Sequence, residues 1–167
     1  LVRGPAHCAS CHATRDREHP ERYTPDTPLS GGLEFSIGPL GAFYATNLTS
    51  DTATGIGGFS DAEIARVIRT GIKHDNRFSI FMRFSAAQPS DEDLVAVISY
   101  LRTLAPVRHE VPAGHFTWMG KLLLPRFPLS MRTSLPPKGV PPGAEPSAAR
   151  GKYLAEHVAL CISCHTT

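Results

Sequence analysis

The sequence contains no cysteine outside two five-residue motifs, and this absence excludes both a disulfide framework and an isolated reactive thiol. Four cysteines occur in 167 residues. All four belong to Cys8-Ala9-Ser10-Cys11-His12 and Cys161-Ile162-Ser163-Cys164-His165. Both motifs have the form Cys-x-x-Cys-His, which is typical of covalent attachment of c-type haem.

Long apolar runs and a strong excess of charge are also missing. No stretch approaches the roughly 20 apolar residues of a transmembrane helix, so any association with a membrane is not expected to use a span in this stretch. The net charge of +2 is too small to indicate a nucleic-acid partner. The first residues show no basic segment followed by an apolar one, so no signal peptide is visible. The hydrophobic content of 41% is that of an ordinary globular protein.

The spacing of the motifs has a physical reason. Residues three and four apart on a helix share a face, so both thiols can reach one porphyrin edge while the histidine approaches the iron. The spacing therefore predicts two haem c groups, each with one axial histidine. Cys8 and Cys11 are predicted to attach the first haem, with His12 as its iron ligand. Cys161 and Cys164 are predicted to attach the second, with His165 as its iron ligand.

Two other chemistries use paired cysteines. A redox dithiol needs Cys-x-x-Cys but not the histidine that follows it in both motifs. Four thiolates can bind zinc, but compact zinc ribbons place their cysteine pairs about 15–20 residues apart, whereas Cys161 follows Cys8 by 153 residues. Disulfides within Cys-x-x-Cys are strained and rarely structural. The pattern therefore favours haem over zinc and over a dithiol.

The second motif belongs to an internal repeat. Residues 1–14 and 154–167 are identical at seven of fourteen positions. We therefore expect two tandem haem domains, of which this sequence holds one nearly whole and the opening of the next. The predicted units are a cytochrome c domain over residues 1–107, a linker over 108–146 and the start of a second cytochrome c domain over 147–167.

Local patterns predict the main elements. A short helix is expected over residues 1–12, and alternating apolar residues predict a hairpin over 33–46. Ser60 or Asp61 caps a helix that ends at Gly71, and Ser90 caps a second that ends before Pro106. The predicted buried positions are Ile64, Val67 and Ile68 in the first helix and Leu94, Val97, Ile98, Leu101 and Leu104 in the second.

Eight prolines in residues 107–146 predict a long, semi-extended linker. Its apolar side chains are expected to pack across the first domain, and docking on a membrane surface or a partner, helped by Lys121, Arg126 and Arg132, is the alternative. These apolar residues are Phe116, Trp118, Met119, Leu122, Leu123, Leu124 and Phe127.

An ordered set of further motifs accompanies the first Cys-x-x-Cys-His. It comprises Gly31-Gly32, Asn47-Leu48-Thr49 with Asp51, Thr54-Gly55-Ile56-Gly57, Phe59-Ser60-Asp61, Arg69-Thr70-Gly71, Met82, Ser90-Asp91-Glu92-Asp93-Leu94 and Ser99-Tyr100-Leu101-Arg102. The set resembles a class I cytochrome c domain, most closely those of the multi-haem cytochrome c subunits that serve membrane-bound alcohol, aldehyde and sugar dehydrogenases. The resemblance implies an all-α fold of short helices around a haem, with a small β-hairpin and long loops.

The sixth iron ligand has two candidates in the first domain, Met82 and His74. The resemblance and the apolar run around Met82 favour its thioether, although Met82 could also be a core residue. The sequence departs from the family in having Phe59 where a Trp is usual and Phe81 and Arg83 where prolines usually flank the methionine. Further residues expected to contact the haem are Phe43, Tyr44, Asn47, Ile56, Phe59, Ile64, Val67, Ile68 and Phe84.

Two firm axial ligands leave no open iron position, which favours an electron carrier over an enzyme. The resemblance implies electron transfer from a dehydrogenase to another cytochrome or an oxidase. Covalent haem attachment occurs outside the bacterial cytoplasm, so a periplasmic location is expected. The alternative is a di-haem enzyme such as a cytochrome c peroxidase, or a haem-based sensor, with one five-coordinate iron.

The distal ligand of the second haem is expected to lie outside this sequence. His157 precedes Cys161 by one helical turn and therefore faces the wrong side of the haem plane. The linker methionines suit packing better than iron ligation. The side chains so excluded are Met119, Met131, His109, His115 and His157.

Overall fold

Helix α2 (Asp61–Thr70) begins at a capping box, as its sequence predicts. The Ser60 hydroxyl accepts a hydrogen bond from the Glu63 amide at 3.3 Å, and the Ser60 amide donates to the Glu63 carboxylate at 2.8 Å. Gly71 follows the helix with φ 70°, the left-handed conformation that glycine adopts readily. The predicted bounds of α2 are confirmed.

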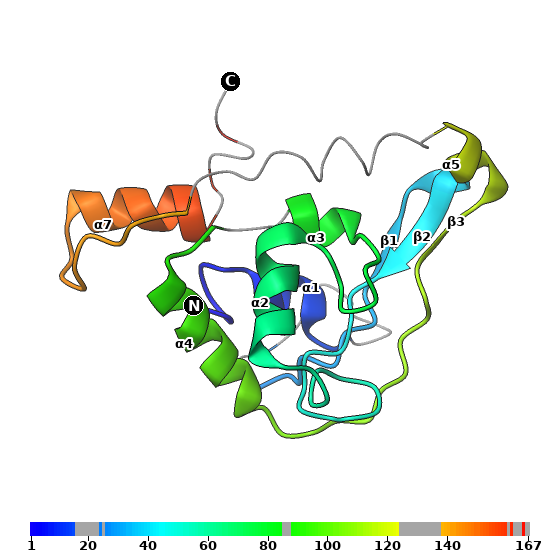
Figure 1. Cartoon of the computed structure of the whole chain (residues 1–167), viewed down its shortest axis with the longest axis horizontal. Coiled ribbons are helices and arrows are strands. Elements are labelled where there is room, and N and C mark those ends of the chain that lie inside the picture. Colours follow the sequence, from blue (N-terminus) through cyan, green and yellow to red (C-terminus); the bar gives the residue numbers. More distant parts are fainter. Residues whose placement is uncertain are drawn as a thin grey trace.

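The computed structural model describes residues 1–15, 24, 26–84, 88–123, 138–159, 161 and 165. Figure 1 shows a group of short helices with a small sheet at one end and α7 at the other. The helices are α1 (Cys8–His12), α2, α3 (Ile80–Phe84), α4 (Asp91–Arg102), α5 (Trp118–Leu123) and α7 (Ala148–Tyr153), and the strands are β1 (Glu34–Ser36), β2 (Gly41–Tyr44) and β3 (His115–Phe116). This architecture is compatible with a cytochrome c-like fold.

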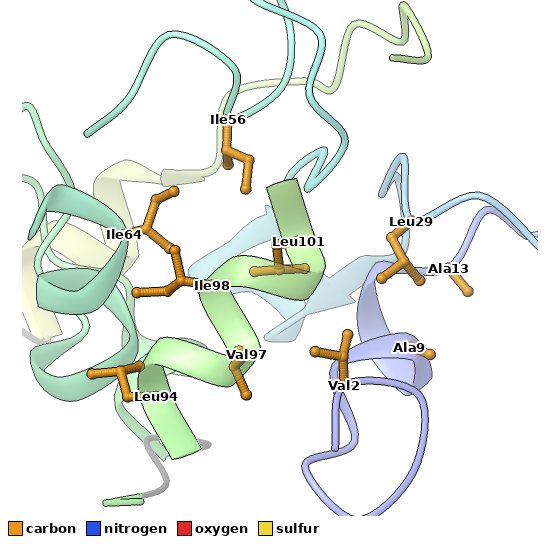
Figure 2. Packing of buried hydrophobic residues seen from close by; sticks show 10 residues of the cluster. All are labelled: Val2, Ala9, Ala13, Leu29, Ile56, Ile64, Leu94, Val97, Ile98 and Leu101. Atoms are coloured by element: carbon orange, nitrogen blue, oxygen red, sulfur yellow. The ribbon is translucent and has the colours of Figure 1, made fainter. Parts of the chain in front are cut away.

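Helix α4 supplies the centre of the hydrophobic core. Ser90 caps it by accepting a hydrogen bond from the Asp93 amide at 3.1 Å. Its predicted apolar stripe is buried, and Ile64 of α2 packs on one side of it while residues near the N-terminus pack on the other (Figure 2). The buried cluster consists of Val2, Ala9, Ala13, Leu29, Ile56, Ile64, Leu94, Val97, Ile98 and Leu101.

The predicted hairpin forms, and a third strand joins it. Strands β1 and β2 pair antiparallel with Phe35 opposite Phe43, and a 3₁₀ turn, Gly38–Leu40, connects them. Strand β3 adds to β2. The hairpin leans on aromatic rings, because Phe81 of α3 stacks on Phe35 at 4.6 Å and Phe116 of β3 contacts Phe43 at 5.0 Å between ring centroids. These neighbours meet its need for an apolar support.

The N-terminal helix is shorter than expected. Residues before Cys8 form turns, and His7 has a left-handed backbone with φ 54°, so α1 covers only Cys8–His12. The expectation of a helix over residues 1–12 is wrong for residues 1–7. Gly4 and Pro5 favour turns over helix in this stretch.

Part of the expected linker is folded onto the first domain. Val107 and His109 bond to the loop that contains Asn47 and Thr54, and residues 115–123 form β3 and α5. Phe116 packs as predicted, but Trp118, Leu122 and Leu123 are 73%, 67% and 62% exposed, so the prediction that they pack across the domain is wrong. The predicted linker residues 124–137, including Leu124, Phe127 and Met131, lie outside the described chain.

The chain then returns to the first domain beside α4. Helix α7 begins at a Ser147 cap and continues into a π-helical turn, Leu154–Val158. It lies next to the start of α4, far from the sheet (Figure 1). None of the helices in the described ranges combines the length and apolar character needed to cross a membrane.

Candidate functional site

Helix α1 places both thiols of the first motif one turn apart. Cys8 and Cys11 are half-buried and unpaired. Burial raises the pKa of the Cys8 thiol to about 11, and it also raises the pKa of Cys11, which the nearby Arg15 charge partly opposes. Among the described residues, no three His, Cys, Asp or Glu side chains gather as a metal site.

His12 follows on the same helix and is only 7% exposed. Its Nδ1 lies 2.7 Å from the carbonyl oxygen of Thr46. A carbonyl can only accept, so Nδ1 carries the proton and Nε2 keeps its lone pair. Burial lowers the pKa of His12, and the Lys73 ammonium lowers it further against the opposing effect of the Thr46 bond. A neutral imidazole with a free Nε2 is the form that ligates iron.

Gly31 lies directly against the Thr46 carbonyl. The Gly31 amide donates to the His12 carbonyl at 2.8 Å, and the Gly32 amide donates to the Ala45 carbonyl at 2.9 Å. Gly31 has φ 76°, and a Cβ there would lie 2.4 Å from the Ala45 oxygen and 2.6 Å from the Thr46 oxygen. Only glycine therefore allows this close approach.

These features fit a covalently bound haem. The donor set consists of two thiols and one oriented imidazole on a single helical turn, which is the chemistry of c-type attachment. Thr46 has no signature in the sequence, because it contributes a backbone carbonyl and any residue type can do so.

The residues expected to contact the haem fall into two groups in the structure. Ile56, Phe59, Ile64 and Ile68 lie in or against the core cluster, and Val67 is half-buried beside them. Phe43 and Tyr44 lie half-buried on β2, where Phe43 belongs to the aromatic group around Phe81. The side chain of Phe84 is outside the described part of the structure.

Both the nitrogen and the oxygen of the Asn47 side-chain amide form hydrogen bonds that hold together the loop around Thr49 and Thr54. It is 2% exposed, and its Nδ2 donates to the Thr54 hydroxyl at 3.1 Å and to the Val107 carbonyl at 2.8 Å. Its Oδ1 accepts from the Thr49 amide at 2.9 Å and the Thr49 hydroxyl at 2.8 Å. Both ends of the amide are therefore satisfied by the protein, and the contact of Asn47 with the haem stays a prediction.

The two candidates for the sixth ligand occupy different environments. Met82 is half-buried on α3, which packs against α2. His74 is exposed, and its ring stacks on Phe59 with 4.2 Å between centroids. A ring packed on a neighbouring aromatic is less free to turn toward a metal.

The structure describes two residues of the second motif, Cys161 and His165. The His165 amide donates to the Cys161 carbonyl at 3.1 Å, so these two residues are one turn apart, as Cys8 and His12 are in the first motif. Both are exposed, and Cys164 lies outside the described residues. The five side chains excluded as its distal ligand have other settings where they are described. His109 Nδ1 lies 2.9 Å from the Ser30 carbonyl, His115 lies in β3, Met119 in α5, and His157 packs on Tyr153.

No family profile matches the chain. Relatives with assigned functions are similar over 95% of its length. It is 32% identical to the gluconate 2-dehydrogenase cytochrome c subunit of Pantoea cypripedii, covering 35% of that protein. It is 29% identical to the alcohol dehydrogenase (quinone) cytochrome c subunit of Gluconobacter oxydans, covering 32%. It is also 29% identical to a diheme cytochrome c-type protein of Cereibacter sphaeroides, covering 53%.

The chain thus spans about a third of the length of the two dehydrogenase subunits. These similarities confirm the resemblance to cytochrome c subunits of dehydrogenases that the motifs indicated. Both of these relatives are named as cytochrome c subunits of dehydrogenases.

Proposed function

We propose that this chain is an electron-transfer unit of a multi-haem c-type cytochrome, with Cys8 and Cys11 holding one haem and His12 ligating its iron. The observation that carries the proposal is the bond between His12 Nδ1 and the Thr46 carbonyl, beside two half-buried thiols on the same turn. This bond fixes the tautomer and the ring orientation that iron ligation needs. The haem, when bound, supplies a one-electron iron couple.

The proposal includes Met82 as the sixth ligand of the first haem. The half-buried position of Met82 on α3 and the stacking of His74 on Phe59 support this choice. A second firm ligand leaves no open iron position for oxygen or peroxide. The chain would therefore carry electrons and would not catalyse a reaction on a substrate.

The proposal also includes a second haem, held by Cys161, Cys164 and His165. The helical hydrogen bond between Cys161 and His165 supports it. We assign residues 1–107 to the first haem domain and residues 147–167 to the second. The predicted distal ligand of this second iron still lies outside the sequence.

We propose a dehydrogenase as the electron donor, a cytochrome or an oxidase as the acceptor, and the periplasm as the location. The names of the relatives support the donor, because two of them are subunits of dehydrogenases. The location is supported by the two attachment motifs, since haem is attached to such motifs outside the bacterial cytoplasm.

The test is to produce the full-length protein in bacteria that attach haem c and to measure bound haem by mass spectrometry. Replacing Cys8 and Cys11 by Ala should remove one haem, and the same change at Cys161 and Cys164 should remove another. Ser10→Ala, between the first two thiols, is the control and should leave the haem content unchanged. A wild-type chain without covalent haem would contradict the proposal.

Carbon monoxide distinguishes a carrier from an enzyme or sensor. If both irons have two firm ligands, the absorption of the reduced protein should not change on exposure to carbon monoxide. A shift of its main haem absorption band would indicate an open iron position and would support the di-haem enzyme or sensor instead.

A further inference from the structure

Tyr153, the last residue of α7, is buried against the first domain although it precedes the second haem motif. It is 3% exposed. Its hydroxyl accepts a hydrogen bond from the Ser90 amide at 2.9 Å and donates one to the Asp93 carboxylate at 2.5 Å. Ser90 is the cap of α4, so the hydroxyl binds directly to the first turn of that helix.

Arg150 and Gly139 make further contacts around the Tyr153 side chain. The Arg150 guanidinium lies 5.1 Å from the centre of the Tyr153 ring and 3.9 Å from the Asp93 carboxylate. The Gly139 amide donates to the Gln88 carbonyl at 2.8 Å. A Cβ at Gly139 would lie 2.6 Å from atoms of both Tyr153 and His157, so the chain passes over these two rings with no room for a side chain.

The contact connects to the site of the first haem. Arg69 of α2 donates to the Pro89 carbonyl at 2.9 Å, and Gln88 donates from its side chain to the Arg69 carbonyl at 2.9 Å. Gln88 is 3% exposed. The segment that holds Tyr153 is therefore tied to α2, the helix that carries Ile64 and Ile68.

The contact connects equally to the second motif. The π-helical turn Leu154–Val158 follows Tyr153 without a break. The Ala159 amide then donates to the Leu154 carbonyl at 2.7 Å, and the Cys161 amide donates to the Ala155 carbonyl at 2.9 Å. A displacement of Tyr153 would thus be transmitted along hydrogen-bonded backbone to Cys161.

We infer that Tyr153 is a positioning residue for electron transfer between the two haems. Held between the Ser90 amide and the Asp93 carboxylate, its hydroxyl fixes the helix of the second haem motif against the first haem domain. Electron transfer depends on the separation and orientation of the two centres, so this contact determines how fast they exchange electrons. The inference rests on the proposed function, because it requires a haem at each motif.

The experiment uses the full-length, haem-loaded protein and the variant Tyr153→Phe, which removes the hydroxyl and keeps the ring. In the docked state, α7 lies against the first turn of α4. Loss of a buried hydrogen bond to a carboxylate should raise the equilibrium ratio of undocked to docked protein by at least about tenfold. Two readouts report on geometry and not on folding. They are the circular dichroism signal from coupling between the two haems and the rate of electron exchange between them after photoreduction of one.

A second variant disturbs the packing around Tyr153 without removing its hydroxyl. Gly139→Ala keeps the tyrosine hydroxyl but pushes a methyl group into the Tyr153 and His157 rings. Tyr100→Phe is the matched control, because Tyr100 lies on α4, the helix that the Tyr153 hydroxyl contacts, and its own hydroxyl accepts from Arg3 at 2.7 Å, within the first domain.

We expect Tyr153→Phe and Gly139→Ala to weaken the coupling signal and slow the exchange severalfold, while Tyr100→Phe changes neither. Wild-type exchange and coupling in both test variants would overturn this inference and leave the proposed function standing. A wild-type protein with no second haem, or with no exchange between its haems, would overturn both.

Discussion

At the scale of single residues, the candidate site depends on Gly31, which is neither a proposed haem attachment site nor a proposed iron ligand. Gly31 lies against the Thr46 carbonyl, and that carbonyl holds the His12 ring. The glycine is needed twice, once for its left-handed φ of 76° and once because a Cβ would collide with backbone. Any replacement of Gly31 should therefore destabilise the fold in two ways, through backbone strain and through steric overlap.

Replacing Gly31 by Ala should lower the free energy of unfolding by on the order of 3 kcal/mol, from left-handed strain and steric overlap together. Gly38→Ala is the matched control, because Gly38 has a similar φ of 61° and open space where the Cβ would be. That variant should lose only about 1 kcal/mol. Urea unfolding of both haem-loaded proteins measures the difference, and equal losses would contradict the role of the close approach.

Met82 is the other residue with a specific expectation. Met82→Ala should abolish the sulfur-to-iron charge-transfer band of the ferric protein. It should also lower the reduction potential of the first haem by at least about 0.1 V, because a thioether favours ferrous iron and axial ligands span roughly 0.8 V. Absorption spectroscopy and a redox titration measure both.

His74→Ala and Met119→Ala are the controls for this prediction, since neither is proposed as a ligand. If the wild-type ferric protein lacks this band, and His74→Ala changes the haem spectrum while Met82→Ala does not, the assignment of the sixth ligand passes to His74.

At the scale of elements, α2 and α4 each begin at a serine cap, and the C-terminal end of α4 is bonded to the start of α2. Arg102, the last residue of α4, donates to Asp61 at 2.7 Å and to the Phe59 carbonyl at 2.5 Å. The start of α2 is thereby held to the end of α4. The capping box at Ser60 lies next to this junction, so it fixes where the face carrying Ile64 begins.

Ser60→Ala should destabilise the protein by about 1 kcal/mol, because it removes the acceptor for the Glu63 amide. Glu63→Gln should keep most of the stability, since an amide oxygen can still accept from the Ser60 backbone. Ser99→Ala, at an exposed position within α4, provides the comparison and should change little. The free energy of unfolding, measured in urea, ranks the stabilities of the three variants. A loss in Ser99→Ala as large as that in Ser60→Ala would contradict the prediction.

At the scale of the whole molecule, Asp91 connects the first domain to the returning chain. Its carboxylate accepts from Lys138 at 3.0 Å and from Arg69 at 2.6 Å. The hydrogen bond from Lys138, with the charges of Lys138 and Arg69, lowers the pKa of Asp91 below its ordinary value. The carboxylate is exposed, so salt should weaken these contacts.

A lowered folded pKa means that the stabilisation is present above the unfolded pKa of about 3.9 and is lost as pH falls through the folded value. Asp91→Asn should therefore be less stable than wild type at neutral pH. The difference should shrink as the pH falls below about 4 and disappear once the pH is below the folded pKa of Asp91. Urea unfolding at a series of pH values measures this convergence. Glu92→Gln, in the same helical turn, is the control, and an identical pH dependence in both variants would contradict the assignment to Asp91.

The sequence alone determined the features that depend on neighbours along the chain. The spacing of Cys8, Cys11 and His12 predicts the proposed site chemistry. Ser60 and Ser90 mark the helix starts, because a cap bonds to an amide three residues away. The apolar stripe of α4 follows from the helical period. The helix predicted over residues 1–7 is wrong, because Gly4 and Pro5 favour turns there.

Tertiary structure decided everything that joins distant residues through groups without a sequence signature. Thr46 meets His12 through a backbone carbonyl, which every residue possesses. Tyr153 is held by a backbone amide and a carboxylate 63 and 60 residues away. Strand β3 joins the hairpin from a proline-rich stretch whose composition predicts an extended linker. Such pairings exist only after the chain has folded, because the elements between them set which groups come within hydrogen-bonding distance.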